Sequence, residues 1–418
     1  MRDERLLERL SRRAPGEWEL YVKTAESREL ASTAESRSER LRREQGWAAR
    51  FWEGGAPRFA SACGEAELER ALSRAARTPT APAEPPEWPG GRTAGQDTPA
   101  LKPPEPPPEL FEEVSRRVSA ESRGEASLTE LTVRRGASLE RIRNARGLDV
   151  SIVTERLDGF ACAAGRRGAR ACEARAVFRW EDGPEAEALA RRLADRATLP
   201  LADRRAPFPI GEWLLDPSVA SALLAAAAPL FTGFPLPAWV ARERLFSPRV
   251  TIVDDAAADA PWDGEGTPTR RVVVVEEGVF RTPLRDLRSA RRSGEEPTGH
   301  GVRPSYRTPP APLPRRLFFE GGRESPRELL SSVRRGLFAS ALTAPASLDL
   351  EADRYDVEFT GVEVLAGRAQ GPVGGARASG RLSELFRRIS AVSTDRQFFP
   401  TPHMTGAPTL LIERAAFE

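Results

Sequence analysis

The stretch ASLTELTVRRGASLERIRNARGLDVSIVTERLDGFACAAGRRGARACEARAVFRW, residues 126–180, decides the fold. Apolar and polar residues alternate in several runs, and the breaks between the runs read RRG, NARG and LDG. Alternation with a period of two predicts strands that bury one face, and the glycine-containing breaks predict turns. We therefore expect an antiparallel meander across these residues.

Helical segments surround this meander. LFEEVSRRVSAE precedes it and PEAEALARRLADRA follows it, each with apolar residues at helical spacing. Nearer the N-terminus we expect an amphipathic first helix, a strand in WELYVKTAE, a hairpin in GWAARFWEGGAPRFASA that turns at Gly54-Gly55, and a helix in GEAELERALSRAAR. The pattern predicts an α+β fold with N-terminal helices packed on antiparallel strands.

Composition predicts four parts along the chain. Residues 78–109 are rich in Pro, Gly, Ala and Glu and include PPEPPPE, which is typical of a stiff linker with too little apolar surface to order itself. After residue 205, short apolar runs dominate, with one clear helix in SPRELLSSVRRGLF. The expected parts are an N-terminal α/β segment (1–77), a proline-rich linker (78–109), the meander with its flanking helices, packing with the N-terminal segment (110–204), and a larger C-terminal β-rich domain (205–418).

Charge and cysteine content exclude several classes of protein. The 63 basic and 61 acidic residues leave a net charge of only +2, so no global field favours nucleic acid. Nearly all the basic residues are arginines, and we interpret most of them as solvated faces. Three cysteines without a CxxC pair argue against a disulfide framework and a zinc ribbon, and a reducing cytoplasm is the expected compartment.

Residues 219–241 carry no charge and are long enough to span a bilayer. Three prolines, Pro229, Pro235 and Pro237, would interrupt such a helix, and much of its apolar content is alanine. We therefore expect no membrane span and no membrane partner.

The segment DPSVASALLAAAAPLF, residues 216–231, has strong start and stop signals for a helix but no reactive side chain. Asp216 can cap the first turn, and Pro217 suits the first helical position because its missing N–H would be unpaired there. Pro229 removes an interior N–H, so the helix is expected to end near Ala228.

Candidate catalytic groups are few. His300 and His403 both lie among Gly, Pro and Thr, as loop residues do, and a catalytic zinc generally needs three protein ligands. The best remaining group is acidic, and its carboxylates could share a proton or hold a divalent cation. The alternative is that these acidic residues, with Gly264 and Gly266 among them, only build a turn between two strands. The group consists of Asp254, Asp255, Asp263 and Glu265.

The later residues resemble the TldD/PmbA family, the so-called modulator-of-gyrase peptidases. The resemblance runs from about Pro209 to Ile412 and lies in an ordered series of segments. These are DGEGTPTRRVVVVEEGVFRTPLRDLRSARRSG, PTGHGVRPSY, EGGRESPRELLSSVRRGLF, VEFTGVEVLAGRAQGPV, SGRLSELFRRISAVSTD and GAPTLLI. Gly46, Gly54, FASA and RNARG resemble the first half of the family more loosely.

This resemblance implies a cytoplasmic assembly of two similar subunits, one with a zinc motif HExxxH on a helix and one without it. Aligning Pro217 with the turn proline of that motif puts Ala225 and Ala226 at the first His and the Glu, and Leu230 at the second His. A late cysteine of the catalytic subunit also has no counterpart in AVSTDRQFFPTPHMTGAP. The resemblance therefore implies a chain without metal or cofactor of its own, most like the PmbA (TldE) side.

Three functions remain open. The first is a non-catalytic subunit that pairs with a zinc-bearing TldD-like homologue and helps enclose a peptide, with Phe234, Trp239, His300 and Tyr306 as candidates for lining the groove. Exposed strand edges would hold an extended peptide by main-chain hydrogen bonds. The second is a hydrolase that uses the four carboxylates with a bound cation. The third is a stand-alone peptide-binding or scaffold protein.

Overall fold

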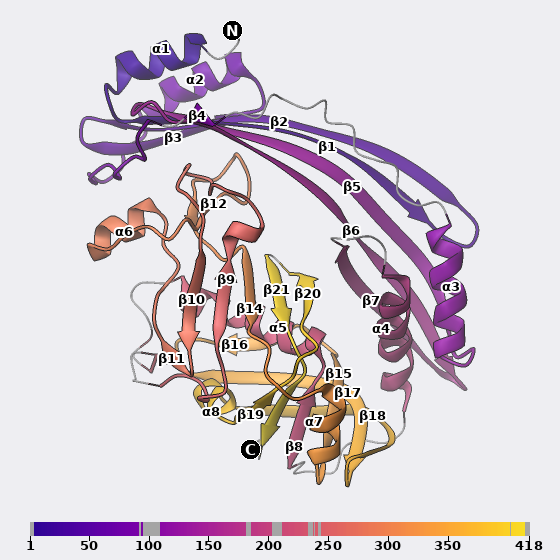
Figure 1. Ribbon diagram of the computed structural model, residues 1–418. Helices are drawn as coiled ribbons and strands as arrows, with labels where there is room; N and C mark the ends of the chain where they lie inside the picture. The colour runs from indigo at the N-terminus through magenta and orange to yellow at the C-terminus, as the bar shows by residue number, and fades with distance from the viewer. Residues whose placement is uncertain are drawn as a thin grey trace.

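A long curved sheet arches over a second, β-rich body in the structure (Figure 1). The computed structural model describes residues 4–91, 93–94, 109–180, 185–202, 211–232, 237, 239–240, 244–401 and 403–413. The α+β prediction is confirmed: helices lie on a mainly antiparallel N-terminal sheet, and the larger C-terminal region is built from many short strands.

The N-terminal body is built on one seven-stranded sheet in the order β3-β2-β1-β5-β6-β4, with β7 paired to β6. The predicted meander is present, since β5, β6 and β7 pair in antiparallel fashion along the chain. The break at NARG is a turn between β5 and β6, but the break predicted at LDG is wrong, because Leu157, Asp158 and Gly159 pair within β6. The elements are α1 (Glu4–Arg13), β1 (Trp18–Ser32), β2 (Arg37–Glu53), β3 (Ala56–Ala62), α2 (Glu65–Ala75), β4 (Thr93–Ala94), α3 (Leu110–Glu121), β5 (Ala126–Asn144), β6 (Asp149–Arg167), β7 (Arg170–Trp180), α4 (Ala186–Thr198) and the short 3-10 turn η1 (Leu199–Leu201).

The hairpin between β2 and β3 turns where the sequence predicts. Gly54 and Gly55 have φ angles of +62° and +73°, which suit a two-residue hairpin turn and which side chains with a Cβ atom rarely adopt. The strands β1 and β2 are longer than predicted, because the polar stretch between the two expected strands also pairs. This stretch lacks the alternating apolar residues that would predict a strand. It is stabilised instead by cross-strand ion pairs, including Glu26 with Arg43 at 2.9 Å.

The C-terminal body contains two larger sheets and a two-stranded ribbon. One sheet has the order β11-β10-β9-β14-β21-β20, the other has the order β16-β17-β15-β8-β22-β19 with β18 on β17, and β12 pairs with β13. The elements are β8 (Glu212–Leu215), α5 (Pro217–Ala227), η2 (Ala228–Phe231), β9 (Ile252–Asp255), η3 (Ala256–Ala258), β10 (Arg271–Glu276), β11 (Val279–Phe280), α6 (Leu287–Ser293), β12 (Gly301–Val302), β13 (Ala311–Pro312), β14 (Arg316–Phe319), α7 (Pro326–Ser332), β15 (Arg335–Leu342), β16 (Ser347–Asp349), β17 (Arg354–Leu365), β18 (Arg368–Arg381), α8 (Leu382–Arg387), β19 (Ile389–Val392), β20 (Gln397–Pro400), β21 (Met404–Ala407) and β22 (Leu410–Glu413).

The helix expected in SPRELLSSVRRGLF is shorter than predicted. It is α7, which starts at a capping box formed by Ser325 and Glu328 and ends at Ser332. The remaining residues form β15, which is held between β8 and β17. Two further short helices, α6 and α8, were not predicted, because six or seven residues are too few to show a clear helical period.

Helix α5 lies between the two larger C-terminal sheets, and it contacts β14, β20 and β21 on one side and β8 and β15 on the other. A helix that is buried on all sides needs apolar residues all round, which accounts for its run of Ala and Leu. Its residues belong to the largest apolar core of the molecule, together with Trp213, Phe246 and Phe359.

No helix in the part of the chain that the structure describes is long and apolar enough to cross a bilayer.

Candidate functional site

Helix α5 begins as the sequence predicts. The carboxylate of Asp216 accepts hydrogen bonds from the backbone N–H of Ser218 at 2.8 Å and from its hydroxyl at 2.6 Å, and Pro217 occupies the first turn. The α-helix ends at Ala227, next to the predicted Ala228, and a 3-10 turn follows. Pro229 in this turn accounts for the change of helix type, since it cannot donate the next hydrogen bond.

The three positions aligned with the zinc motif lie in packed surroundings. Ala225 and Ala226 are half-buried on the last turn of α5, and Leu230 is only 1% exposed within the main C-terminal core. None of the three side chains can coordinate a metal. Within the described ranges, no group of three or more His, Cys, Asp or Glu residues is placed to hold a metal ion.

Asp254 and His300 form a buried pair. His300 Nε2 lies 2.9 Å from Asp254 Oδ1, and both side chains are inaccessible to solvent. Asp254 also accepts hydrogen bonds from the backbone N–H groups of Arg315 and Arg316 at 3.0 and 3.3 Å. The pair therefore ties strand β9 to the start of β14 and to the loop before β12.

Asp263 organises a turn. Its carboxylate accepts from the backbone N–H groups of Glu265, Thr267 and Gly301 at 2.8–2.9 Å. Burial raises the pKa of Asp263 above its ordinary value, although these three donors oppose the shift. Asp255, at the end of β9, is only half-buried and lies apart from this turn, opposite Arg271 in the strand register.

Glu265 is part of a buried charge network between the two bodies. Arg50 on β2 places one guanidinium nitrogen 2.7 Å from Glu265 and the other 2.8 Å from Glu19 on β1. Arg303 also binds Glu19 and donates to the Gly264 carbonyl at 2.7 Å. We name Glu19, Arg50, Glu265 and Arg303 the interdomain charge network.

Burial and the neighbouring charges both affect the pKa of Glu265. Burial raises the pKa of Glu265, the guanidinium of Arg50 opposes this shift, and the nearby carboxylate of Asp263 adds to it. The three buried carboxylates of the acidic group thus each have protein donors, and the structure does not bring all four together.

The residues that the sequence predicts to line a substrate groove lie in different surroundings in the structure. Trp239 is buried in the C-terminal core, where its indole N–H donates to the Leu350 carbonyl at 2.7 Å. Tyr306 is buried in a small cluster with Tyr21 at the interface of the two bodies, and His300 is held by Asp254. Phe234 lies outside the described residues.

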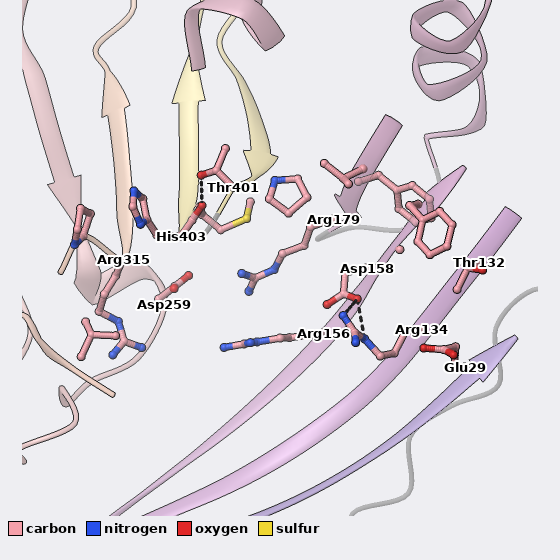
Figure 2. Close-up of a pocket in the computed structure, with 18 of the residues that line it drawn as sticks. Glu29, Thr132, Arg134, Arg156, Asp158, Arg179, Asp259, Arg315, Thr401 and His403 are labelled. Atoms are coloured by element: carbon pink, nitrogen blue, oxygen red, sulfur yellow. Dashed lines mark hydrogen bonds and ion pairs between the residues drawn. The ribbon is translucent and has the colours of Figure 1, made fainter. Parts of the chain in front are cut away.

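A cavity of about 450 Å³ lies between the long sheet and the C-terminal body. Figure 2 shows Arg156 and Arg179 reaching from the strands of the long sheet toward Asp259, Arg315 and His403 on the facing wall. Apolar residues complete the lining. They are Phe160, Val177, Phe178, Val302, Pro314, Pro400 and Met404. We name this space the interdomain cavity.

Six arginines and four acidic residues line the interdomain cavity, so its fixed charge is positive. Three nitrogen atoms of lining residues are buried without a hydrogen-bond partner among the described residues, namely Arg303 Nη1, Arg315 Nε and His403 Nε2. Burial lowers the pKa of His403, and the charge of Asp254 opposes this shift. The imidazole of His403 is therefore biased toward its neutral form.

The sequence did not single out this site. Arg156 and Arg315 are two of many arginines, and His403 was noted only as a loop residue, which lies directly before β21. The positions that converge come from β6, from the start of β14 and from the approach to β21. No spacing along the chain signals that convergence.

Comparisons with known proteins agree with this architecture. Residues 214–418 match a family model described as "PmbA/TldA metallopeptidase C-terminal domain". The chain is 27% identical over 157 residues to a "Metalloprotease TldD homolog" of Haemophilus influenzae, an alignment that covers 36% of this chain and 32% of that protein. It is also 24% identical over 244 residues to a "Metalloprotease" of Methanothermobacter thermautotrophicus, covering 54% of this chain and 52% of that one.

The first of these relatives are matched over about a third of their length or less. The fold as a whole is similar to that of TldE from Thermococcus kodakarensis, with a TM-score of 0.83 and 19% sequence identity over 99% of this chain and 98% of that chain. At 19% identity, this similarity shows a shared fold only.

Proposed function

Because the chain belongs to the PmbA/TldD metallopeptidase family through its C-terminal domain, residues 214–418, we propose that it is the subunit without a zinc site in a two-subunit peptidase of this family. It pairs with a zinc-bearing homologue and helps to hold the peptide substrate. The partner supplies the metal and the hydrolytic step. This chain supplies part of the wall around the peptide.

The observation that carries the proposal is the composition and packing of α5. Ala225, Ala226 and Leu230 occupy the positions aligned with the zinc motif, and Leu230 is part of the apolar core. Zinc needs nitrogen, sulfur or oxygen ligands, and these three side chains offer none. The helix thus acts as a packing element between the two C-terminal sheets.

Two strand edges support a role in holding a peptide. Among the described strands, β7 pairs only with β6 and β20 pairs only with β21, so each has one edge without a hydrogen-bonded strand, and the two strands lie close to each other across the two bodies. Both strands contribute to the lining of the interdomain cavity, β7 through Val177 and Phe178 and β20 through Pro400. An extended peptide can add to such an edge through main-chain hydrogen bonds.

The carboxylate hydrolase finds less support. Asp254, Asp263 and Glu265 are buried and use their oxygens on His300, on backbone N–H groups and on Arg50. A cation would have to displace these donors. Asp255 is half-buried, so this member of the acidic group can be replaced without breaking such contacts. We expect Asp255→Asn to change any partner-dependent peptidase activity by no more than about threefold. Removing a catalytic acid or base would have a larger effect.

Co-expression with an HExxxH-bearing homologue from the same genome tests the proposed function. We expect the two chains to elute together, zinc to be found in the homologue, and peptide cleavage to require both. The isolated chain is expected to hold far less than one zinc after dialysis. Stoichiometric zinc and peptide cleavage by the isolated chain would overturn the proposal, and a chain that binds peptides but never the homologue would favour the stand-alone scaffold.

A further inference from the structure

The interdomain cavity has cationic groups that the protein itself does not neutralise. Arg156, on β6, is exposed, and within the described residues no carboxylate lies at ion-pair distance from its guanidinium or from that of Arg315. Figure 2 shows these two side chains on opposite walls of the cavity. A charged group held between them would face a guanidinium from each body of the molecule.

Three of the four carboxylates that line the cavity have an arginine close by. Asp158 accepts two hydrogen bonds from Arg134 at 2.7 and 2.9 Å, and Glu29 lies 3.3 Å from Arg42. Asp259 lies 3.8 Å from Arg316. None of these three carboxylates is paired with Arg156 or Arg315, although the buried Asp263 behind the wall interacts electrostatically with Arg315. Arginines outnumber acidic residues in the lining by six to four, so the cavity favours an anionic ligand.

The unpartnered nitrogens on the C-terminal wall point to the same ligand. Arg315 Nε and His403 Nε2 are both shielded from solvent, and leaving a buried donor without an acceptor is unfavourable. The Arg315 backbone is fixed by its hydrogen bond to Asp254 at 3.0 Å, so the base of its side chain is anchored. An acceptor oxygen in the cavity would satisfy such donors without a rearrangement of the main chain.

We propose that the interdomain cavity binds acidic peptide segments, with Arg156 and Arg315 clamping a carboxylate from opposite walls and His403 Nε2 donating a hydrogen bond to it. This inference rests on the proposed function, since it names the class of peptide that the same site takes. The planar guanidinium group matches the geometry of a carboxylate. Phe160, Val177 and Met404 add apolar contacts for the flanking residues of the peptide.

A binding assay on the isolated chain tests this. A fluorescent peptide with two glutamates among aliphatic residues is compared with the same peptide in which both glutamates are glutamines, by anisotropy at low ionic strength. We expect the acidic peptide to bind about tenfold more tightly or better, because a charge-assisted contact in a partly buried site is worth more than 1.4 kcal/mol.

The variants Arg156→Gln and Arg315→Gln separate the two walls. Each variant is expected to bind the acidic peptide about tenfold more weakly, and its affinity for the glutamine peptide should change by no more than about twofold. The matched control is Arg368→Gln, because this exposed arginine lies on the β17–β18 hairpin, outside the cavity lining. Arg156 is exposed, so its variant tests the proposal even if the Arg315 variant folds poorly.

Equal binding of the two peptides, or unchanged affinity in both cavity variants, would overturn the inference. So would complete displacement of the acidic peptide by an equal concentration of inorganic phosphate, which would indicate a general anion site. The assay needs no partner, so it is independent of co-elution with the zinc-bearing homologue. A chain that assembles with the homologue but shows no preference for acidic peptides would contradict this inference alone.

Discussion

The guanidinium of Arg50 lies 2.7 Å from the carboxylate of Glu265, and this contact joins strand β2 of the long sheet to the turn before β10. The same guanidinium is 2.8 Å from Glu19 and stacks at 5.0 Å over the ring of Trp88. One buried arginine thus satisfies two carboxylates from different bodies of the molecule.

Replacing this arginine is expected to destabilise the chain strongly. Arg50→Met leaves Glu265 buried without its cation, and breaking one side of a buried ion pair costs about 3–5 kcal/mol. The free energy of unfolding in urea measures this loss. Arg377→Met, in an exposed pair with Asp356, serves as the control and is expected to change nothing measurable. A loss below about 1 kcal/mol for Arg50→Met would mean that the network contributes little net stability.

The close approach of Gly46 to Tyr306 gives a steric prediction. A Cβ atom added at Gly46 would lie 2.3 Å from the Tyr306 ring, so Gly46→Ala must displace that ring from the interface of the two bodies. We expect a loss of about 1–3 kcal/mol in the free energy of unfolding, as for other overpacked sites. Because the cause is size, adding Tyr306→Leu should cost less than the sum of the two single changes. Additive losses would contradict a direct clash.

The pH dependence of stability is expected to include a contribution from Asp195 on α4. Burial raises the pKa of Asp195 from 3.8 to about 6, and the nearby Asp216 adds to the shift. As pH rises between these values, the unfolded chain releases this proton first, so the folded state loses stability.

Asp195→Asn removes this titration. The difference in stability between variant and wild type should shift in favour of the variant by up to about 2–3 kcal/mol from pH 3.5 to pH 7, because at pH 3.5 the folded chain and most of the unfolded chain still carry the proton. Urea unfolding at the two pH values measures the change. Glu187→Gln, at an exposed position of the same helix, is the matched control. A stability difference that is the same at both pH values would contradict the raised pKa.

Writing the zinc motif back into α5 is expected to fail. The triple variant Ala225→His, Ala226→Glu and Leu230→His puts a polar ring at a core position that is 1% exposed. Loss of the leucine packing and burial of a polar group should cost about 2–5 kcal/mol. Pro229 also keeps the last position off a regular helix.

Zinc analysis and a peptidase assay of the purified triple variant measure the outcome, and we expect weak zinc binding and no cleavage by the chain alone. Ala225→His alone, at a half-buried position, is the matched control for the loss of stability and should be tolerated better. Tight zinc binding with cleavage of peptides would mean that the metal site was nearly intact.

Local structure can be predicted from the residues alone in two situations. One is an element that buries a single face against a core, and the other is a turn that needs a particular backbone conformation. The alternation in residues 126–180 predicts β5, β6 and β7, Gly54-Gly55 predicts the hairpin turn, and Asp216 and Pro217 predict the start of α5. These signals depend on neighbouring residues only, so they can be read from one chain. The charged ends of β1 and β2 could not be predicted in this way, because pairing to β5 and cross-strand ion pairs hold them in the sheet.

Which polar residues act together depends on the packing of the whole chain. Asp254, Asp263 and Glu265 are near neighbours in the sequence, yet one binds His300, one caps a turn and one pairs with Arg50, some two hundred residues away. Arg156, Arg315 and His403 are far apart in the sequence, and they meet at the interdomain cavity. The physical reason is that charge and hydrogen-bonding partners are chosen by distance in space and by exclusion of water, and the packing of the long sheet over the C-terminal body sets both.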